Sequence, residues 1–562
     1  MKHSKIITAT KLLLWVYPLL LIVPNIWLSF SEPYAAVSKT VNLTLPLGAY
    51  YLIVGMSRRS GLAVTMTIPI AFFCAFQIVL LYLYGESIIA IDMFMNVATT
   101  NVSEASELLG NLSLAIITVL LLYVPPLAFG VWLIWNKTIT PADVLRNIRL
   151  AGASLVCVGF IAMASAYASC SDYSARRELF PMNVACNLVD AALRVRQAAD
   201  YMTTSEKFNY HAVNLRHDSI PEIYVLVIGE TSRADNWQIF GYDRQTNPRL
   251  SRRPGLLKYP RTLSESNTTH KSVPMLLSCL HSGNFKDSVF RVKSIFEAFN
   301  ETGANTIFLS NQPENHSYID FYTSQAREVR RICSDGITHH DHELLDCLSR
   351  YIAGASQKQT FIVLHTYGSH YCYNERYTNE FRKFIPDNAT DASSRNRPDL
   401  INAYDNSIVY TDALLDSIID MLDTSGCRSA MVYTSDHGED IFDDRRGRFL
   451  HASPTPTYWQ LHVPMLVWMS DEFRAAYPAL YSAAYTNQPK AVSSTLSVFD
   501  TLLDLAGIAS DSRHPDQSLC KEAYNEPSRR YLNDYNEGVP LDDSGLKAED
   551  FILLKNLEPV RQ

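Results

Sequence analysis

The chain has little that would suit nucleic acid or a cysteine-based metal site. It contains no basic stripe, no internal repeat and no low-complexity tract, and its formal net charge is −8 over 562 residues. No two cysteines stand at the Cys-x-x-Cys spacing typical of structural zinc sites. These absences argue against a nucleic-acid-binding protein and against a cysteine zinc domain.

Charge is also missing from long parts of the first third of the chain. Four stretches contain no charged residue, namely 12–30, 61–85, 112–135 and 150–168. Each is long enough to cross a hydrocarbon core about 30 Å thick. A fifth uncharged stretch, 41–56, is shorter and contains Pro46, so it is either a further span or an interfacial or buried segment. The sequence predicts an α-helical membrane domain of five transmembrane helices over residues 1–169.

The charges between these spans predict the orientation of the domain. Basic residues precede the first span and occupy the second–third and fourth–fifth connections: Lys2, Lys5, Lys11, Arg58, Arg59, Lys137, Arg146 and Arg149. The third–fourth connection has acidic residues and neither Lys nor Arg. By the positive-inside rule, residues 1–11, 57–60 and 136–149 are cytoplasmic and everything after Cys170 is outside the cytoplasm. The first span is too long, and too soon followed by others, for a cleaved signal peptide.

The outer part of the chain carries eight of the ten cysteines. In an oxidising compartment such a set is compatible with disulfides, and Cys333 and Cys347 are a possible local pair. Eight cysteines allow 105 pairings, so the connectivity cannot be derived from the sequence.

Two further regions follow the spans. Residues 170–217 form a bridge in which 187–202 has apolar residues at helical spacing mixed with arginines, typical of an amphipathic helix on the membrane or of a plain connecting helix. Residues 218–562 alternate short apolar strands with helical stretches, which predicts an α/β domain with a mostly parallel central sheet. The predicted strands include 224–228, 306–309, 360–365 and 430–434, and the helices include 292–300 and 401–422.

Two acidic motifs stand where predicted strands end. Glu230 follows strand 224–228, and Asp436 and His437 follow strand 430–434. In an open α/β sheet, ligands bind outside the carboxyl ends of the strands, so these side chains should share one rim. Either motif alone could be a polar turn after a buried strand. Together, two carboxylates and an imidazole suit a divalent, zinc-like ion.

A third segment, 265–275, offers a nucleophile. Small hydroxyl residues lead through Thr269 into Ser-Val-Pro and an apolar run that could be a helix. The amino end of a helix stabilises anions such as phosphate. A zinc-coordinated threonine there could act as a nucleophile, although composition alone equally allows an ordinary helix cap.

Taken together, these motifs resemble the phosphoethanolamine transferases, membrane members of the alkaline phosphatase/sulfatase superfamily that include the mobile colistin-resistance enzymes. The resemblance covers nearly the whole chain. It rests on the five spans and on five motifs: Gly-Glu-Thr-Ser-Arg-Ala-Asp at 229–235, Thr-x-x-Ser-Val-Pro at 269–274, His-Thr-Tyr-Gly-Ser-His at 365–370, Ser-Asp-His-Gly-Glu at 435–439 and Phe-Leu-His at 449–451.

The resemblance implies roles for particular residues. The metal ligands would be Glu230, Thr269, Asp436 and His437, with Thr269 also the nucleophile, seen as phosphothreonine in the family. His370 and His451 would be accessory donors or ligands of a second zinc, and His370 would also protonate the leaving group. The substrate-binding residues would be Asn96, Thr100, Glu104 and Lys271.

Three residues near these motifs have competing interpretations. Thr231 competes with Thr269 as nucleophile, because many members of the superfamily place theirs beside the first acidic ligand. His365 is either functional or a satisfied buried histidine. Glu439 is expected to begin a helix or to support a ligand rather than to bind metal itself.

The implied activity is transfer of phosphoethanolamine from phosphatidylethanolamine to lipid A, the lipopolysaccharide core or another envelope glycan. The enzyme would be a monomer with one or two Zn²⁺, in the inner membrane of a Gram-negative cell with its catalytic domain in the periplasm. Alternatives are a glycerophosphate transferase resembling lipoteichoic acid synthases, a phosphodiesterase, a sulfatase, or a non-enzymatic membrane receptor or transporter subunit. No Cys/Ser-x-Pro-x-Arg motif follows Glu230, which argues against a sulfatase.

Two departures bear on this resemblance. The stretch between His437 and His451 is longer than in the colistin-resistance enzymes. The segment 309–312 looks more like the branch that acts on core sugars or other glycans, which leaves the acceptor open.

Overall fold

The computed structural model describes residues 2–85, 87–94, 112–171, 173–216, 220–314, 317–333, 339–355, 359–389 and 392–558. These form two compact units. Within the described part of the chain, the first covers residues 2–193 and 446–448, and the second covers residues 194–445 and 449–558. The expected substrate contacts Asn96, Thr100 and Glu104 lie outside the described residues.

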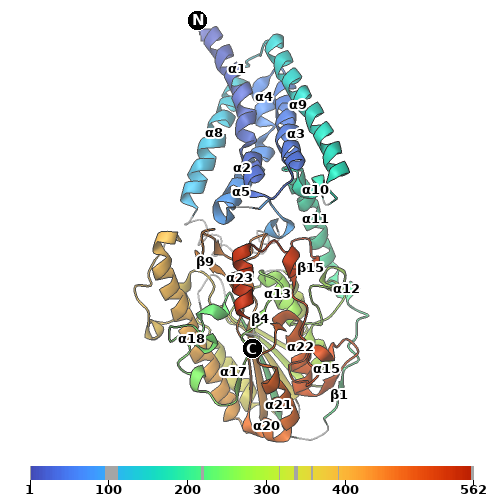
Figure 1. The fold of residues 1–562 in the computed structure, drawn as a ribbon, viewed down its shortest axis with the longest axis vertical. Coiled ribbons are helices and arrows are strands. Elements are labelled where there is room, and N and C mark those ends of the chain that lie inside the picture. The colour runs from blue at the N-terminus through green and yellow to red at the C-terminus, as the bar shows by residue number, and fades with distance from the viewer. Residues whose placement is uncertain are drawn as a thin grey trace. The chain divides into compact units, whose positions relative to one another are not determined.

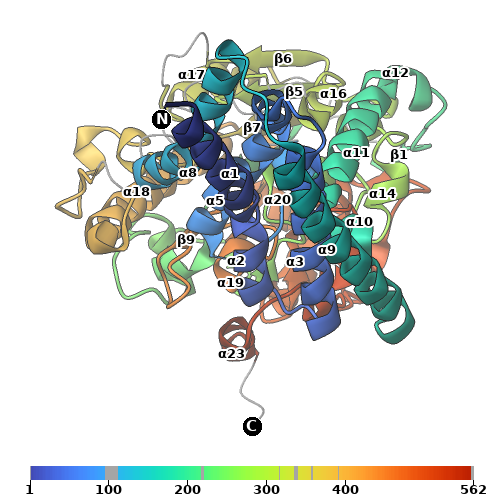
Figure 2. The same ribbon diagram turned by 90° about the horizontal axis from the view of Figure 1, so that it is seen from above.

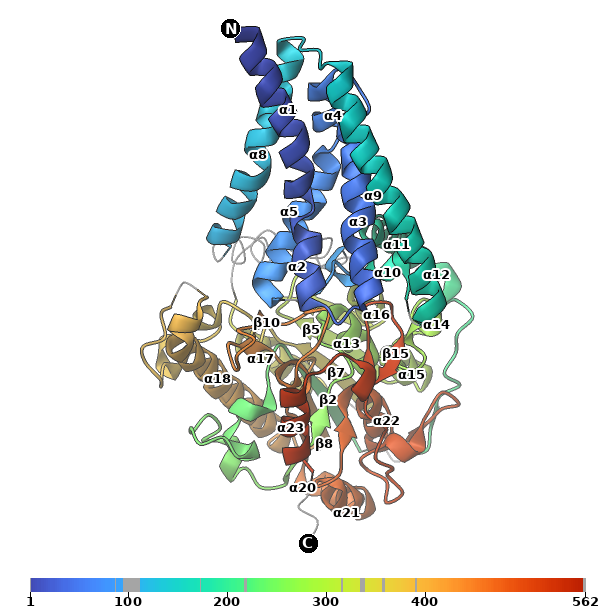
Figure 3. The ribbon, with the colours of Figure 1, turned by 45° about the horizontal axis from the view of Figure 1, so that its top comes forward.

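The N-terminal unit is helical (Figure 3). Most residues of the uncharged stretches lie in its helices, with breaks inside two of the stretches at residue 22 and at residues 66–67. Three helices in its described part are long and apolar enough to cross a membrane: Lys5–Ser31, Ser113–Trp135 and Ala142–Ser169. Ile68–Tyr84 is apolar but shorter. The structure therefore contains an apolar helical region with three candidate spans, fewer than the five expected. The helices are α1 (Lys2–Leu21), α2 (Val23–Ser31), α3 (Ala36–Gly55), α4 (Ser60–Thr65), α5 (Ile68–Tyr84), α8 (Ser113–Trp135) and α9 (Ala142–Ser169).

Helices α3 and α9 pack side by side through glycines (Figure 2). A Cβ at Gly48 would lie 2.8 Å from the carbonyl oxygen of Gly152, and one at Gly152 would lie 2.9 Å from that of Gly48. Only glycine permits this approach of two backbones, a packing typical of helices in membranes.

The bridge predicted for residues 170–217 is largely helical. It contains α10 (Ala175–Glu178), α11 (Met182–Ala199) and α12 (Tyr201–Thr204). On α11, Val184 and Ala191 are buried while Leu188 and Leu193 are about half exposed. The helix therefore carries apolar residues on its exposed as well as its buried side.

The C-terminal unit is built around a central sheet (Figure 1). This sheet has seven strands in the order β3-β11-β8-β2-β7-β5-β6. The strands are β2 (Glu222–Gly229), β3 (Leu256–Lys258), β5 (Asn305–Ser310), β6 (Glu328–Arg331), β7 (Gln359–His365), β8 (Arg428–Ser435) and β11 (Met465–Met469). The run from β8 to β6 is parallel, whereas β11 is antiparallel to both β8 and β3. The sheet is therefore mixed, with a parallel centre and one antiparallel edge.

Both faces of the sheet are covered. Alternate residues of β2 point to opposite faces: Leu226 lies in one hydrophobic core and Val225 in another. The first core includes residues of α13 (Thr269–Leu276), α15 (Ile295–Glu301) and α22 (Ser494–Ala506), and the second includes residues of α17 (Glu343–Ala353) and α18 (Arg397–Asp423). Burial on both faces explains the unbroken apolar runs that predict these strands.

Shorter elements surround this sheet. The strands are β1 (Val213–Asn214), β4 (Thr262–Leu263), β9 (Asp440–Ile441), β10 (Phe449–Leu450), β12 (Val492–Ser493), β13 (Ile508–Ala509), β14 (Arg530–Leu532) and β15 (Gly538–Pro540). The helices are α14 (Phe285–Ser288), α16 (Tyr318–Thr323), α19 (Tyr458–Leu461), α20 (Asp471–Ala476), α21 (Pro478–Asn487) and α23 (Ala548–Asn556). Of these, β14 and β15 pair with each other as an antiparallel hairpin.

The expectation of disulfides is corrected by the structure, in which none of the ten cysteines is disulfide-bonded. Cys333 and Cys347 are not bonded to each other. Several cysteines instead lie among the apolar side chains of the two cores, Cys279 and Cys520 in the first and Cys347 and Cys372 in the second. In such positions a free cysteine behaves as a small hydrophobic residue.

Candidate active site

Strand register brings the two acidic motifs together. In the parallel pair of β2 and β8, Gly229 is the register partner of Ser435, so Glu230 and Asp436 are the next residues on neighbouring strands. The amide of Asp436 donates a hydrogen bond to Gly229 O at 3.0 Å. On the other side of β2, Gly368 packs on Glu230: its φ is +56°, and a Cβ there would lie 2.6 Å from Glu230 O.

Thr269 is the first residue of α13 and reaches the same point. Its Oγ1 donates a hydrogen bond to Glu230 Oε1 at 3.2 Å and lies 3.1 Å from His437 Nε2. Ser264 Oγ donates to Asp436 O at 2.6 Å, which ties the chain just before α13 to the end of β8. Thr269 is half-buried, whereas Glu230, Asp436 and His437 are buried, so its hydroxyl is the more accessible group.

The buried groups form an arrangement of hydrogen-bond acceptors that favours a cation. His437 Nδ1 lies 2.9 Å from Gly438 O, which only accepts, so Nδ1 carries the proton and Nε2 presents a lone pair. That lone pair lies 3.2 Å from Asp436 Oδ2 and 3.5 Å from Glu230 Oε1. Asp436 Oδ2 has no hydrogen-bond partner among the described residues. We call Glu230, Asp436 and His437 the carboxylate–histidine cluster.

Burial sets the charge state of this cluster in the absence of a cation. It raises the pKa of Glu230 to about 7, helped by the charge of Asp436, and raises the pKa of Asp436 to about 7. Burial also lowers the pKa of His437, which keeps the imidazole neutral. A bound divalent cation would compensate the two carboxylates and accept the imidazole lone pair, so these donors fit a zinc-like ion.

His370 and His451, the two histidines expected to be accessory, lie beside the cluster. The rings of His437 and His451 are 4.3 Å apart, and those of His451 and His370 are 5.8 Å apart. Ligand atoms of Glu230, His437 and His451 all lie within 4.8 Å of one another. Glu439 faces His451, with Oε2 at 3.3 Å from Nδ1, and its other oxygen accepts from the Tyr373 hydroxyl. Glu439 thus contacts an accessory histidine.

Thr231 and His365, whose roles the sequence left open, make fewer described side-chain contacts to the carboxylate–histidine cluster than Thr269 does. Thr231 Oγ1 donates to Glu230 Oε1 at 2.9 Å, as Thr269 does, but no contact of its hydroxyl to His437 is described. His365 ends β7 and is buried, and burial lowers its pKa to about 3. Its Nε2 has no hydrogen-bond partner in the described part of the chain.

Lys271, expected to contact substrate, instead donates a hydrogen bond to the backbone of the protein itself. It is buried, and its Nζ donates a hydrogen bond to Asn533 O at 2.8 Å, in the turn between β14 and β15. The same hairpin holds two more residues before Thr269. Leu532 N donates to Glu265 O at 2.7 Å, and the Tyr531 hydroxyl donates to Asn267 Oδ1 at 2.8 Å. The hairpin therefore anchors the segment that carries Thr269.

Replacing Lys271 with methionine is expected to lower the free energy of unfolding of the C-terminal unit by about 2 kcal/mol, because a buried charged hydrogen bond is lost. Thermal unfolding of the detergent-solubilised protein would measure this. Lys286→Met is the matched control: Lys286 Nζ pairs with Glu537 of the same hairpin at 2.9 Å, but both side chains are substantially exposed. That variant should cost less than about 0.5 kcal/mol. An unchanged midpoint for Lys271→Met with a raised KM for the donor would place the ammonium at the substrate instead.

Sequence reasoning missed two residues that contact this region. Gln312 follows β5 and donates from Nε2 to Glu230 Oε2 at 3.0 Å. Its position after a predicted strand is the signal that marks Glu230, and it could have been found the same way. Tyr404 of α18 donates from its hydroxyl to Thr231 O at 2.7 Å and accepts from Arg233 N at 2.9 Å. No local pattern in the sequence marks that tyrosine.

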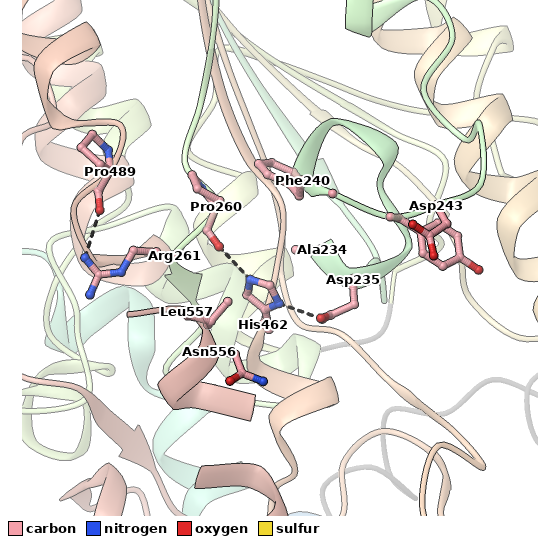
Figure 4. Close-up of a pocket in the computed structure, with 12 residues that line it drawn as sticks. Ala234, Asp235, Phe240, Asp243, Pro260, Arg261, His462, Pro489, Asn556 and Leu557 are labelled. Carbon is pink, nitrogen blue, oxygen red and sulfur yellow. Dashed lines mark hydrogen bonds and ion pairs between the residues drawn. The ribbon is translucent and has the colours of Figure 1, made fainter. Parts of the chain in front are cut away.

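A separate hollow of about 490 Å³ lies in the same unit (Figure 4). Its lining includes Asp235, Arg261 and His462. His462 Nδ1 lies 2.7 Å from Asp235 Oδ2, and its Nε2 lies 2.9 Å from Pro260 O. Neither Thr269 nor any residue of the carboxylate–histidine cluster lines this hollow.

Comparison with known families decides the classification of this fold. The family model for sulfatases matches residues 222–508. The chain belongs to the sulfatase family. A second family model, described as phosphoethanolamine transferase EptA/EptB, matches residues 62–197. The resemblance to phosphoethanolamine transferases inferred from the motifs is thereby confirmed.

Individual relatives agree with both matches. The chain is 30% identical over 305 residues to phosphoethanolamine transferase EptA of Escherichia coli strain K12, covering 52% of this chain and 55% of that one. It is 28% identical over 316 residues to Kdo(2)-lipid A phosphoethanolamine 7''-transferase of Salmonella typhimurium, covering 54% of each. The matched region thus spans about half the length of these curated relatives.

A solved structure matches more of the chain. The integral membrane protein lipooligosaccharide phosphoethanolamine transferase A of Neisseria meningitidis has a TM-score of 0.67 and 22% identity, covering 89% of this chain and 97% of that one. At this identity the likeness shows the fold alone.

Proposed function

We propose that the protein transfers phosphoethanolamine from phosphatidylethanolamine to an envelope acceptor, lipid A, the lipopolysaccharide core or another glycan. The observation that carries the proposal is the position of Thr269. Its hydroxyl contacts both Glu230 and His437, at the start of a helix in a sulfatase-family domain. The chain that precedes this domain matches the phosphoethanolamine transferase model, and its curated relatives carry that activity in their names.

Glu230, Thr269, Asp436 and His437 would hold a zinc ion, and His370 and His451 would be accessory groups or ligands of a second one. When bound, zinc would lower the pKa of the Thr269 hydroxyl and balance negative charge at phosphorus. The lone pair of His437 Nε2 and the unpartnered Asp436 Oδ2 support this assignment.

The transfer would proceed in two steps. Thr269 Oγ1 attacks the phosphorus of the donor, a bond forms between them, and the bond from phosphorus to the diacylglycerol oxygen breaks. The Thr269 hydroxyl proton is released to solvent. Nδ1 of His370 lies 2.7 Å from Tyr371 O, which only accepts, so Nδ1 carries the proton of the neutral ring and Nε2 is the transferring atom. His370 would take a proton from solvent at Nε2 and pass it to the leaving oxygen. In the second step an acceptor oxygen attacks the same phosphorus, the bond to Thr269 breaks, and the acceptor loses its proton while Thr269 Oγ1 regains one, which restores the hydroxyl.

The N-terminal helices would give this site access to a lipid donor. We propose five spans over residues 1–169, a bridge at 170–217 and a periplasmic catalytic domain at 218–562, in a monomer of the inner membrane. The apolar helices and the charge pattern between them support this arrangement. Asn96, Thr100, Glu104 and Lys271 are proposed as donor contacts, although for Lys271 the bond to Asn533 favours the anchoring role described above.

Mass spectrometry of envelope lipid A and glycans from cells with and without the protein would test the function. Species carrying added phosphoethanolamine should be present only with the active protein. Release of free phosphoethanolamine without a modified acceptor would identify a phosphodiesterase instead.

Reporter fusions would test the orientation. Fusions within 57–60 and 136–149 should report the cytoplasm, and fusions after Cys170 should report the periplasm, because Lys and Arg are retained on the cytoplasmic side. A fusion at Gly438 that reports the cytoplasm would contradict both the topology and the use of a lipid in the outer leaflet.

A further inference from the structure

The loop after β5 has no role in the transfer described above, yet it touches the carboxylate–histidine cluster directly. Gln312 Nε2 donates two hydrogen bonds, one to Glu230 Oε2 at 3.0 Å and one to Thr366 O at 2.8 Å. Thr366 follows β7, and Glu230 follows β2, so this amide joins the ends of two neighbouring strands.

The amide of Gln312 is held in place by its own loop. The backbone N–H of Gln312 donates to Ser310 Oγ at 2.9 Å, and that hydroxyl donates to Gln312 O at 3.0 Å. The neighbouring Asn311 donates from its backbone to His365 O at 2.9 Å and from its side chain to Asp341 Oδ1 at 2.8 Å. The loop is therefore held by hydrogen bonds at both residues, and the backbone that carries the Gln312 side chain is fixed in position.

This contact makes the two oxygens of Glu230 different. Oε2 accepts from Gln312, whereas Oε1 accepts from Thr269 and lies 3.5 Å from His437 Nε2. We propose that Gln312 is a positioning residue, which holds Oε2 so that Oε1 is the oxygen presented to the metal and to Thr269. A neutral amide suits this task, because it stabilises a carboxylate without bringing a positive charge that would oppose a cation. The proposal rests on the zinc site of the proposed function, not on the identity of the acceptor.

A purely structural role for Gln312 makes a different prediction. The bond to Thr366 O could simply join two loops. In that case, loss of the amide would reduce stability, and it would change zinc affinity no more than loss of a glutamine amide far from the cluster does. Gln325 is a matched control of the same residue type. Its side chain accepts from Ser294 N at 2.7 Å and donates to Tyr201 Oη at 2.8 Å, and no contact to the cluster is described for it.

The test is zinc affinity, measured by chelator competition on full-length protein in detergent, for wild type, Gln312→Met and Gln325→Met. Methionine keeps the length of the side chain and removes its hydrogen bonds. Loss of a partner that orients a metal ligand typically weakens binding 10- to 100-fold, so the zinc Kd of Gln312→Met should rise about that much. The zinc Kd of Gln325→Met should stay within about twofold of the wild-type value. This should hold even if its thermal midpoint falls as much as that of Gln312→Met.

Every outcome bears on the proposal. Equal zinc affinity of Gln312→Met and wild type would overturn the positioning role while leaving the proposed function intact. Equal weakening in both variants would show a general loss of stability and would also overturn it. A wild-type protein that binds no zinc would overturn the metal site and this inference together.

Discussion

Replacing Thr269 with alanine is expected to reduce phosphoethanolamine transfer by at least about 10³-fold while leaving the protein folded and in the membrane fraction. The reason is that the hydroxyl proposed to form the covalent intermediate is removed, whereas Glu230, Asp436 and His437 all remain. Transfer from labelled phosphatidylethanolamine would measure the loss. Mass spectrometry of the peptide containing residue 269 should detect phosphoethanolamine on wild type during turnover and none on the variant.

Thr231→Ala is the matched control, because Thr231 also donates to Glu230 Oε1 and also lies at the cluster. This variant should keep the modified Thr269 peptide. Zinc content should be near wild type in Thr231→Ala. Thr269→Ala loses one of the four proposed ligands, so it should still bind zinc through the other three but with lower affinity. Near-normal transfer by Thr269→Ala, with the modification found on Thr231, would reverse the assignment of the nucleophile.

Metal removal is expected to lower the thermal midpoint more at pH 8 than at pH 5.5. Burial raises the pKa of Glu230 from 4.5 to about 7 in the metal-free protein, and that of Asp436 from 3.8 to about 7. An acid whose pKa is higher in the folded state contributes stability that is present below its unfolded pKa and is lost as the pH rises through about 7. One such shift is worth about 3 kcal/mol, or about 5 °C for a domain of this size.

Differential scanning fluorimetry with and without chelator would show this pH dependence, and Asp436→Asn provides the control. The variant lacks one of the two carboxylates, so its metal-free form should melt higher than the metal-free wild type at pH 8. It should also bind little zinc and respond little to the chelator at either pH. A chelator effect of equal size at pH 5.5 and pH 8 would contradict the account of two buried carboxylates whose pKa values are raised by burial.

Much of the parallel sheet could be predicted from the sequence, because its strands are buried on both faces and therefore read as continuous apolar runs. The predicted strands 224–228, 360–365 and 430–434 fall within β2, β7 and β8. The antiparallel edge could not be predicted in the same way. β3 has three residues, and its partner β11 lies some 200 residues further along, so no local pattern announces the pairing.

The candidate site likewise contains residues that the sequence could predict and residues that it could not. Glu230, Asp436 and His437 could be predicted because each directly follows a recognisable strand, and Gln312 shares that signal. The surroundings of Lys271 could not be predicted, since its hydrogen-bond partner lies 262 residues away in a hairpin whose contacts only the tertiary structure reveals. The bonding state of the cysteines could not be predicted either. Whether a thiol lies next to another cysteine or next to an apolar side chain depends on packing, not on the spacing of cysteines in the sequence.

The hairpin of β14 and β15 also imposes an order of events on synthesis. The segment from Glu265 to Lys271 is held by Tyr531, Leu532 and Asn533, which leave the ribosome long after every residue of the cluster. A nascent chain that has released its first 508 residues already holds all the residues matched by the sulfatase model, but its Thr269 segment still lacks these anchors. Full alignment of Thr269, the proposed nucleophile, therefore waits for the last tenth of the chain, so that an incomplete product is expected to be a poor catalyst of the proposed transfer.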